Sequence, residues 1–259
     1  MNLSELLGGS IGALYRSELV TSSRSITVSK AGWAVVSGMG GGAGGTKSST
    51  YPPGNSAPWG VKAFRVAPGD VVAFTIGAGG AGNASGAALA GGATTITLNG
   101  VTIMTCQPGD AGVTSAKAPV NAQVIGADVW VPGRQPQAAV GMATGGAAVD
   151  CGSGTSNIGG GDSAVQLNST ATVGCPWGTH FWPFDVTFTS STTGSGNPGW
   201  GAAHGNPAGM FAGGNGASDP SVTHPGGRGA SAGISSNGAT AAKAGGDGLG
   251  HIRLYANLG

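Results

Sequence analysis

Charged residues are scarce in this sequence, and their signs are balanced: eleven basic and ten acidic residues give a formal net charge of +1. No basic stripe is available to follow a phosphate backbone, so nucleic acid is not an expected partner. No run approaches the roughly 20 apolar residues of a membrane span, so we expect no membrane-spanning segment. The first residues carry no cationic stretch ahead of an apolar one, which argues against a secretory signal.

Cysteine is also rare, and the odd set of Cys106, Cys151 and Cys175 has no CxxC spacing. Such a set predicts buried thiols rather than a disulfide framework, although a bond between Cys151 and Cys175 stays open. Two G-x-G-x-x-G matches, at 40–45 and 77–82, reflect glycine frequency, since neither opens a helix between two strands. We therefore expect no enzymatic activity and no cofactor.

Ligand spacing for a metal is missing as well. The four histidines lie far apart in the sequence, without a second histidine or a carboxylate pair beside them. A zinc site based on Cys175 and His180 would still require a third ligand. We expect no metal.

Glycine is what the sequence has in excess, with 54 residues of 259. Ordered glycine costs about 0.5–1 kcal/mol relative to alanine inside a regular element, so this composition often indicates a flexible, low-complexity chain. Six tryptophans and several runs of alternating apolar and polar residues favour an ordered protein instead. Helical periodicity is confined to the start, so we expect a mainly β and irregular fold with one short N-terminal helix.

Alternation predicts strands that are joined by recognisable turns. Residues 61–66 and 71–76 flank Ala67-Pro68-Gly69-Asp70, whose proline and glycine suit a type II turn, so we expect a hairpin. A second hairpin is predicted within 96–103, where Asn99-Gly100 suits a type I′ turn. The other strand candidates are residues 25–36 and 251–255.

The glycine tracts lack the strict third-position glycine of collagen, but they can run as extended threefold helices with about 3 residues per turn. Such helices have no internal hydrogen bonds. Because their side chains are minimal, neighbouring backbones can approach and bond laterally. We therefore expect strands combined with packed polyglycine II helices in a glycine-rich sandwich. The tracts are 38–45, 77–82, 86–93, 141–146, 152–161, 194–201, 213–216, 226–233 and 245–250.

The order of these strands and tracts resembles the glycine-rich domain at the ends of bacteriophage tail fibres and tail-tip proteins. The resemblance rests on SITVSKAGWAVVSGMGGGAGG, VKAFRVAPGDVVAFTIGAGGAG, AGGATTITLNGVTI and AGGDGLGHIRLY, within residues 25–110 and 243–256. It is similar to the polyglycine II sandwich adhesins of T-even-like long tail fibres. The resemblance implies a virion protein made in the host cytoplasm and placed at the distal end of the tail. Its implied partners are a host receptor, either an outer-membrane protein or a surface polysaccharide, and a fibre or baseplate protein.

Receptor contacts are expected on the connectors between tracts, because loops on a rigid scaffold commonly carry recognition. The connector 174–188 holds five aromatic residues, which either pin a long loop to the body or form an exposed binding platform. The connectors fall mainly within 111–242 of a domain over 17–259. The receptor-binding candidates are Tyr51, Trp59, Trp130, Trp177, His180, Phe181, Trp182, Phe184, Trp200, His204 and Phe211.

Residues 1–16 are predicted to be a separate docking segment. Leu3, Leu6 and Leu7 share one face of a helix that is too short to be stable alone, so it must pack on something. The apolar patch expected to enter a fibre or baseplate protein consists of Leu3, Leu6, Leu7, Ile11, Leu14 and Tyr15.

Two other functions stay open at this point. A structural cap of the tail tip or fibre would use the same aromatic loops against neighbouring virion proteins only. A glycine-rich ice-binding protein would need flat, regular rows of small residues, and the irregular tract spacing argues against such rows.

Overall fold

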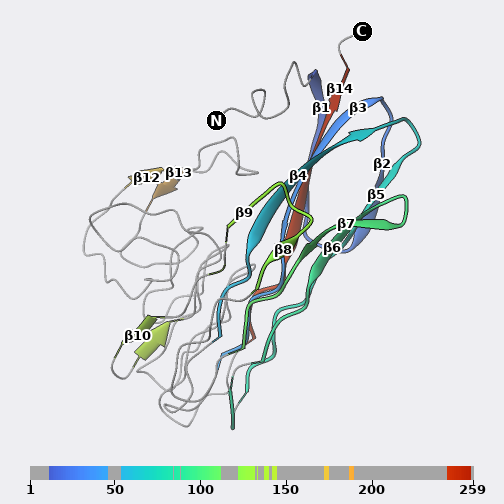
Figure 1. The fold of residues 1–259 in the computed structure, drawn as a ribbon. Helices are drawn as coiled ribbons and strands as arrows, with labels where there is room; N and C mark the ends of the chain where they lie inside the picture. The colour runs from blue at the N-terminus through green and yellow to red at the C-terminus, as the bar shows by residue number, and fades with distance from the viewer. Residues whose placement is uncertain are drawn as a thin grey trace.

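Two five-stranded antiparallel sheets pack face to face, and extended glycine-rich segments continue from one end of both sheets (Figure 1). The computed structural model describes residues 12–45, 54–83, 85–87, 89–111, 122–131, 133, 137–139, 142–144, 172–174, 187–189 and 244–257. This described part contains strands and irregular segments but no α-helix, and hence no helix that is long and apolar enough to cross a membrane.

The sheets are built from strands that are distant in sequence. The first sheet has the spatial order β1 (Ala13–Val20), β14 (Leu249–Ala256), β3 (Gly32–Met39), β4 (Trp59–Val66) and β9 (Val129–Val131). The second sheet has the order β2 (Arg24–Thr27), β5 (Val71–Thr75), β6 (Thr94–Leu98), β7 (Val101–Cys106) and β8 (Val124–Ile125). Two separate pairs are β10 (Gln137–Ala139) with β11 (Met142–Thr144), and β12 (Thr172–Gly174) with β13 (Thr187–Thr189).

The hydrophobic core lies between the two sheets. Alternation along β3 and β14 turns Val36 and Ile252 toward the second sheet, where they join Phe74 and Ile96. All four side chains are at most 2 % exposed. Burial of each such side chain contributes about 1.5–3 kcal/mol, so this layer is what holds the sheets together.

The hairpin predicted over 61–76 is wrong, although both strands and the turn are present. β4 pairs with β3 and β9, whereas β5 pairs with β2 and β6, so the turn carries the chain from one sheet to the other. Gly69 has the positive φ of +93° that the turn requires, and the amide of Asp70 donates to the carbonyl of Ala67 at 3.1 Å. The turn is fixed by the adjacent crossing from β2 to β3, since Val28 and Asp70 bond through their backbones at 2.8 Å. A turn sequence determines where a chain reverses, but not which neighbour each arm bonds.

The second predicted hairpin is confirmed. Leu98 of β6 pairs with Val101 of β7, and Asn99 and Gly100 have φ values of 49° and 82°. The predicted closing strand at 251–255 is also confirmed, because β14 lies between β1 and β3 in the first sheet.

The predicted boundary between residues 16 and 17 falls inside β1. Leu14 and Tyr15 belong to this strand, which pairs antiparallel with β14 and forms the edge of the first sheet. Leu14 is 52 % exposed, and Tyr15 packs against the core. The sheet therefore holds both residues. The predicted helix, with Leu3, Leu6, Leu7 and Ile11, lies outside the described residues.

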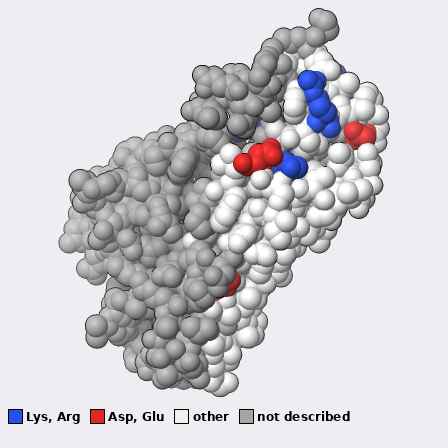
Figure 2. All heavy atoms as spheres, viewed as in Figure 1, with Lys and Arg blue, Asp and Glu red and all other residues white. Residues whose placement is uncertain are grey.

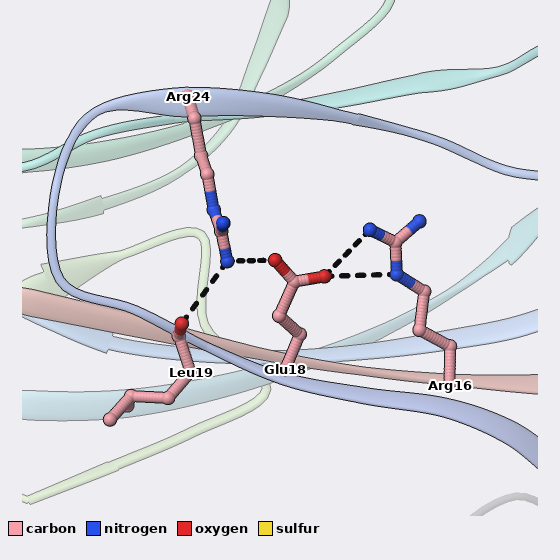
Figure 3. Close-up of polar contacts among 4 residues, drawn as sticks. All are labelled: Arg16, Glu18, Leu19 and Arg24. Carbon is pink, nitrogen blue, oxygen red and sulfur yellow. Dashed lines mark hydrogen bonds and ion pairs between the residues drawn. The ribbon is translucent and has the colours of Figure 1, made fainter.

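Ion pairs close the edge of the sandwich where β1 faces β2 (Figure 3). Glu18 accepts from Arg16 at 2.6 Å and also pairs with Arg24, which belongs to the other sheet. Arg24 donates further to the carbonyl of Leu19 at 3.2 Å. These side chains are partly exposed, so the pairs contribute little to stability and mainly orient the edge.

Candidate functional site

Four excursions of the chain leave the sheets at the same end and return to it. The first runs from β3 to β4, the second from β5 to β6, the third from β7 to β8, and the fourth from β9 to β14. The described extended segments of these excursions, which we call the glycine bundle, are 40–45, 54–58, 76–82, 89–93, 107–111, 122–123, 133 and 244–248. The connectors between them are residues 46–53, 83–88, 112–121 and 134–243. The bundle runs away from the sheets in Figure 1.

Segment 40–45 lies in the centre of the bundle and donates hydrogen bonds with a threefold pattern. The amides of Gly41, Gly42 and Ala43 donate to Gly92, Gly246 and Asn55, at 2.9, 2.9 and 3.2 Å. The next amide, that of Gly44, returns to the first neighbour and donates to Leu89 at 2.8 Å. A repeat of three residues with only lateral hydrogen bonds is the pattern of a polyglycine II helix.

The carbonyls of the same segment accept from two further neighbours. Gly41 accepts from the amide of Gly109 at 2.9 Å, and Gly42 accepts from Gly80 at 2.8 Å. One turn later Gly45 accepts from Asn83 at 3.0 Å, so segment 76–82 follows the central segment in parallel. Every one of these contacts is between backbone atoms.

Close backbone approach explains why these positions are glycine. A Cβ atom added at Gly41 would overlap the carbonyl of Ala78, and one added at Gly44 would overlap the carbonyl of Ala81. The predicted lateral packing is thus confirmed for residues 40–45, 77–82, 89–93 and 245–248 of the predicted tracts, whereas residues 38–39 and 249–250 belong to β3 and β14. Residues 142–144 of tract 141–146 form β11 instead. The remaining tracts lie outside the described residues.

Polar side chains secure the bundle where the connectors begin. The carboxylate of Asp110 accepts from the amide of Ala122 at 3.2 Å, and its carbonyl accepts from the amide of Asn55 at 2.9 Å. Asn83 shapes the connector 83–88, because its amide group donates to the carbonyl of Ala87 at 2.8 Å and its oxygen accepts from Ser85 at 3.1 Å. The connectors therefore start from fixed stems.

The described surface of the bundle carries almost no charge on the face seen in Figure 2, and the charged side chains gather over the sheets. Leu89, directly after the connector 83–88, is 47 % exposed. The sequence analysis proposed no receptor-binding residue in connector 83–88. Asn83, which directly follows tract 77–82, was the sequence signal that a turn begins there.

The structure separates the predicted receptor residues. Trp59, predicted on a connector, instead lies in β4 and is 4 % exposed. Trp130 lies in β9 at the edge of the first sheet and is 41 % exposed, so it is not part of a connector. The others, which lie outside the described residues, are Tyr51, Trp177, His180, Phe181, Trp182, Phe184, Trp200, His204 and Phe211. Tyr51 belongs to connector 46–53, and the remaining eight belong to connector 134–243.

Two titratable groups are buried in the sheets and serve packing. His251 of β14 is 5 % exposed, and its Nε2 lies 3.0 Å from the hydroxyl of Ser17. Burial, together with the positive charge of Arg253, lowers the pKa of His251 to about 4, so the ring is neutral near pH 7. Burial raises the pKa of the Cys106 thiol to about 12. Among the described residues, no three His, Cys, Asp or Glu side chains are grouped to hold a metal ion.

Comparison with known proteins adds one finding. A family model described as a glycine-rich domain matches residues 20–255. A search of curated proteins finds no match. The matched range begins at the last residue of β1 and ends within β14, so it includes the second sheet, the first sheet apart from β1, and the whole glycine bundle.

Proposed function

Because the chain belongs to the glycine-rich domain family, we propose that it is an adhesin at the tip of a bacteriophage tail or tail fibre. In this role it binds a receptor on the host cell surface during attachment. The family match supports only the presence of a glycine-rich domain. The proposed place at a phage tail or fibre tip rests on the resemblance described in the sequence analysis.

The observation that carries the proposal is a bundle of extended segments that backbone hydrogen bonds join and that the connectors link along the sequence. The bonds of segment 40–45 involve main-chain atoms only, so they place no demand on the side chains of the connectors. A rigid scaffold with freely variable loops at one end is a common arrangement for recognition. The described segments 40–45 and 76–82, which precede connectors 46–53 and 83–88, run away from the sheets.

The aromatic residues of the connectors suit a receptor that offers sugar rings or apolar groups. Connectors 46–53 and 134–243 contain Tyr51, Trp200 and Phe211, and aromatic rings of this kind stack on sugars or on apolar side chains. Leu89, which follows connector 83–88, adds an exposed apolar side chain. The proposal assigns no catalytic step to these residues.

Attachment to the particle is assigned to the residues before β1. Leu3, Leu6, Leu7 and Ile11 precede the first strand, and they provide an apolar segment for a fibre or baseplate protein. Removal of residues 1–11 leaves β1 intact, so the truncated protein should fold and bind cells but fail to assemble onto particles. Aggregation of the truncated protein would contradict the docking role.

Competition for adsorption tests the receptor-binding role. Purified protein, added to susceptible cells before a phage that carries this chain, should slow adsorption. Tyr51→Ala and Trp200→Ala should each weaken this competition about tenfold or more, as expected for aromatic hot spots. Trp130→Ala is the matched control, since this exposed tryptophan lies in β9, and it should compete like the unaltered protein.

The outcomes separate the adhesin from a structural cap. A cap would bind particles or tail proteins but leave adsorption unchanged at every concentration. Equal loss of competition in Trp130→Ala and Tyr51→Ala would move the binding surface from the connectors to the first sheet.

A further inference from the structure

The first sheet ends in an unusually long edge strand. β1 pairs with β14 on one side, and no described strand pairs with its other side. It has eight residues, whereas the other edge strands of the two sheets, β2, β8 and β9, have four, two and three. A long open edge offers a row of backbone groups with which another chain can pair.

The hydrogen-bond pattern of β14 shows which backbone groups of β1 face this open edge. The amide of Asn257 donates to the carbonyl of Ala31 at 3.0 Å, so the odd-numbered residues of β14 bond to β3. The even-numbered residues 250, 252 and 254 therefore bond to β1. The residues of β1 opposite them are Val20, Glu18 and Arg16. Between these positions, Ser17 and Leu19 direct their amides and carbonyls toward the open edge.

A side chain of the other sheet confirms this orientation. Arg24 of β2 donates to the carbonyl of Leu19 at 3.2 Å, which requires that carbonyl to point away from β14 (Figure 3). Ser17 is exposed, and no described residue bonds to its backbone amide or carbonyl. Its groups are thus the open donor and acceptor in the middle of the edge.

Side chains of opposite charge flank Ser17. Arg16 and Glu18 lie on the same side of β1 and form an ion pair at 2.6 Å within the strand. When two identical strands pair antiparallel about a twofold axis at Ser17, Arg16 of each copy lies opposite Glu18 of the other. Opposite charges at directly opposed positions favour a strand pair, so this edge is complementary to itself.

The other registers are less favourable. Outward backbone groups must meet outward groups, so a twofold pair is centred on Ser17, Glu18 or Leu19. A centre at Glu18 would place the two Glu18 carboxylates opposite each other. A centre at Leu19 would oppose two carbonyls that already accept from Arg24. Only the centre at Ser17 has both complementary charges and open backbone groups.

We propose that two copies of this chain pair antiparallel through β1, with Ser17 at the twofold axis, so that their first sheets join into one continuous sheet. The amide of each Ser17 donates to the carbonyl of the other Ser17. Arg16 of each copy faces Glu18 of the other. The inference concerns self-association and does not depend on receptor binding.

The shared ladder is short, so the dimer should be weak. A register shift between Leu14 and Arg16 interrupts β1 on one side of Ser17, and Arg24 occupies the carbonyl of Leu19 on the other. Some apolar burial adds to these bonds. Leu14 is 52 % exposed and shares the outer face of the sheet with Leu19, and antiparallel pairing brings Leu14 of one copy near Leu19 of the other.

Sedimentation velocity of the purified full chain tests the association without cells or receptor. Between about 1 μM and about 1 mM, the protein should shift from monomer toward dimer and no further, because a twofold pair closes. A monomer throughout this range would overturn the proposal. Growth into larger species would overturn it as well.

Two variants of Ser17 locate the contact on the backbone. Ser17→Pro removes the outward amide, and proline is tolerated on edge strands where the amide faces away from the sheet. Its dimer dissociation constant should rise at least about tenfold. Ser17→Ala is the matched control: it also loses the hydroxyl beside His251 but keeps the amide, so its dissociation constant should stay within about twofold. Equal constants for the two variants would overturn the assignment to β1.

A charge exchange tests the register and keeps the proposal testable should Ser17→Pro fail to fold. Arg16→Glu, at an exposed side chain, places like charges opposite each other twice in the dimer and should raise the dissociation constant about tenfold. Adding Glu18→Arg to this variant restores opposite charges and should bring the constant back to within about threefold of the unaltered protein. An unchanged dimer in Arg16→Glu, or no recovery in the double variant, would overturn the Ser17-centred pair.

Discussion

Gly44 donates its backbone amide to the carbonyl of Leu89 at 2.8 Å, and the two residues need no side-chain contact to do so. One turn earlier, the amide of Gly41 makes the equivalent bond to Gly92 at 2.9 Å. The stability of the bundle therefore depends on how closely the main chains approach, and substitutions that add a Cβ atom should be its most sensitive probes.

Gly44→Val should destabilise the protein by about 3 kcal/mol or more, because the added side chain would overlap the carbonyl of Ala81. Urea unfolding measures the loss. The matched control is Ser85→Val in the exposed connector, for which we expect a change within about 0.5 kcal/mol. Equal stability of the two variants would show that the bundle does not require close backbone packing.

Gly100→Ala and Gly69→Ala should each lower the free energy of unfolding by about 1 kcal/mol, and by the same mechanism. Both glycines have positive φ, +82° and +93°, and a Cβ atom would meet nothing within 4 Å at either position. The cost is therefore backbone strain without a clash. Thermal unfolding of both variants checks this, and a loss well above that range at either position would reveal a contact that the structure does not contain.

The free energy of unfolding should fall as pH decreases from about 6.5 to about 4, in part because of His251. Its pKa is lowered from 6.5 to about 4 in the folded protein, so the unfolded chain binds a proton first. Neutral, buried His251 stabilises the folded protein above pH 6.5, and this stabilisation is lost as the pH falls from about 6.5 to about 4. It amounts to at most about 3 kcal/mol.

His251→Gln isolates this effect, since glutamine keeps a hydrogen-bonding group but does not titrate. Urea unfolding at several pH values should show a shallower pH dependence for the variant, although the carboxylates still titrate. Parallel curves for the two proteins would rule out a neutral, buried His251.

Cys106 should resist thiol reagents while the protein is folded. Burial raises its pKa to about 12, so almost no reactive thiolate exists near pH 8. A variant with Cys151→Ser and Cys175→Ser leaves this single thiol, which should react with Ellman's reagent only after denaturation. Rapid reaction of the folded variant would show that β7 opens readily.

Local sequence signals predicted much of the fold. The Asn99-Gly100 turn and its hairpin, the strand at 251–255 and the lateral packing of tracts such as 77–82 are confirmed, because each depends on backbone conformation that a few residues dictate. The predicted hairpin over 61–76 is wrong, since its local turn is compatible with either pairing or crossing between sheets.

Burial was the other property that local sequence did not reveal. Trp59 follows a proline-rich stretch and resembles a loop aromatic, yet it pairs with Met39 inside the first sheet. β1 was missed because its run of mixed residues acquires strand form only by pairing with β14, which lies at the other end of the chain.

The sequence by itself determined two local features. Its glycine tracts can bond only through their main chains, and its turns need φ angles that only glycine or asparagine adopt readily. The tertiary structure alone decided which tracts are neighbours, and that Gly41, Gly42 and Ala43 reach three different segments. The physical reason is that a polyglycine helix has the same backbone groups on every side. Its own sequence therefore cannot specify which segment lies beside it. The pairing of the strands from which the segments continue determines which segments are neighbours.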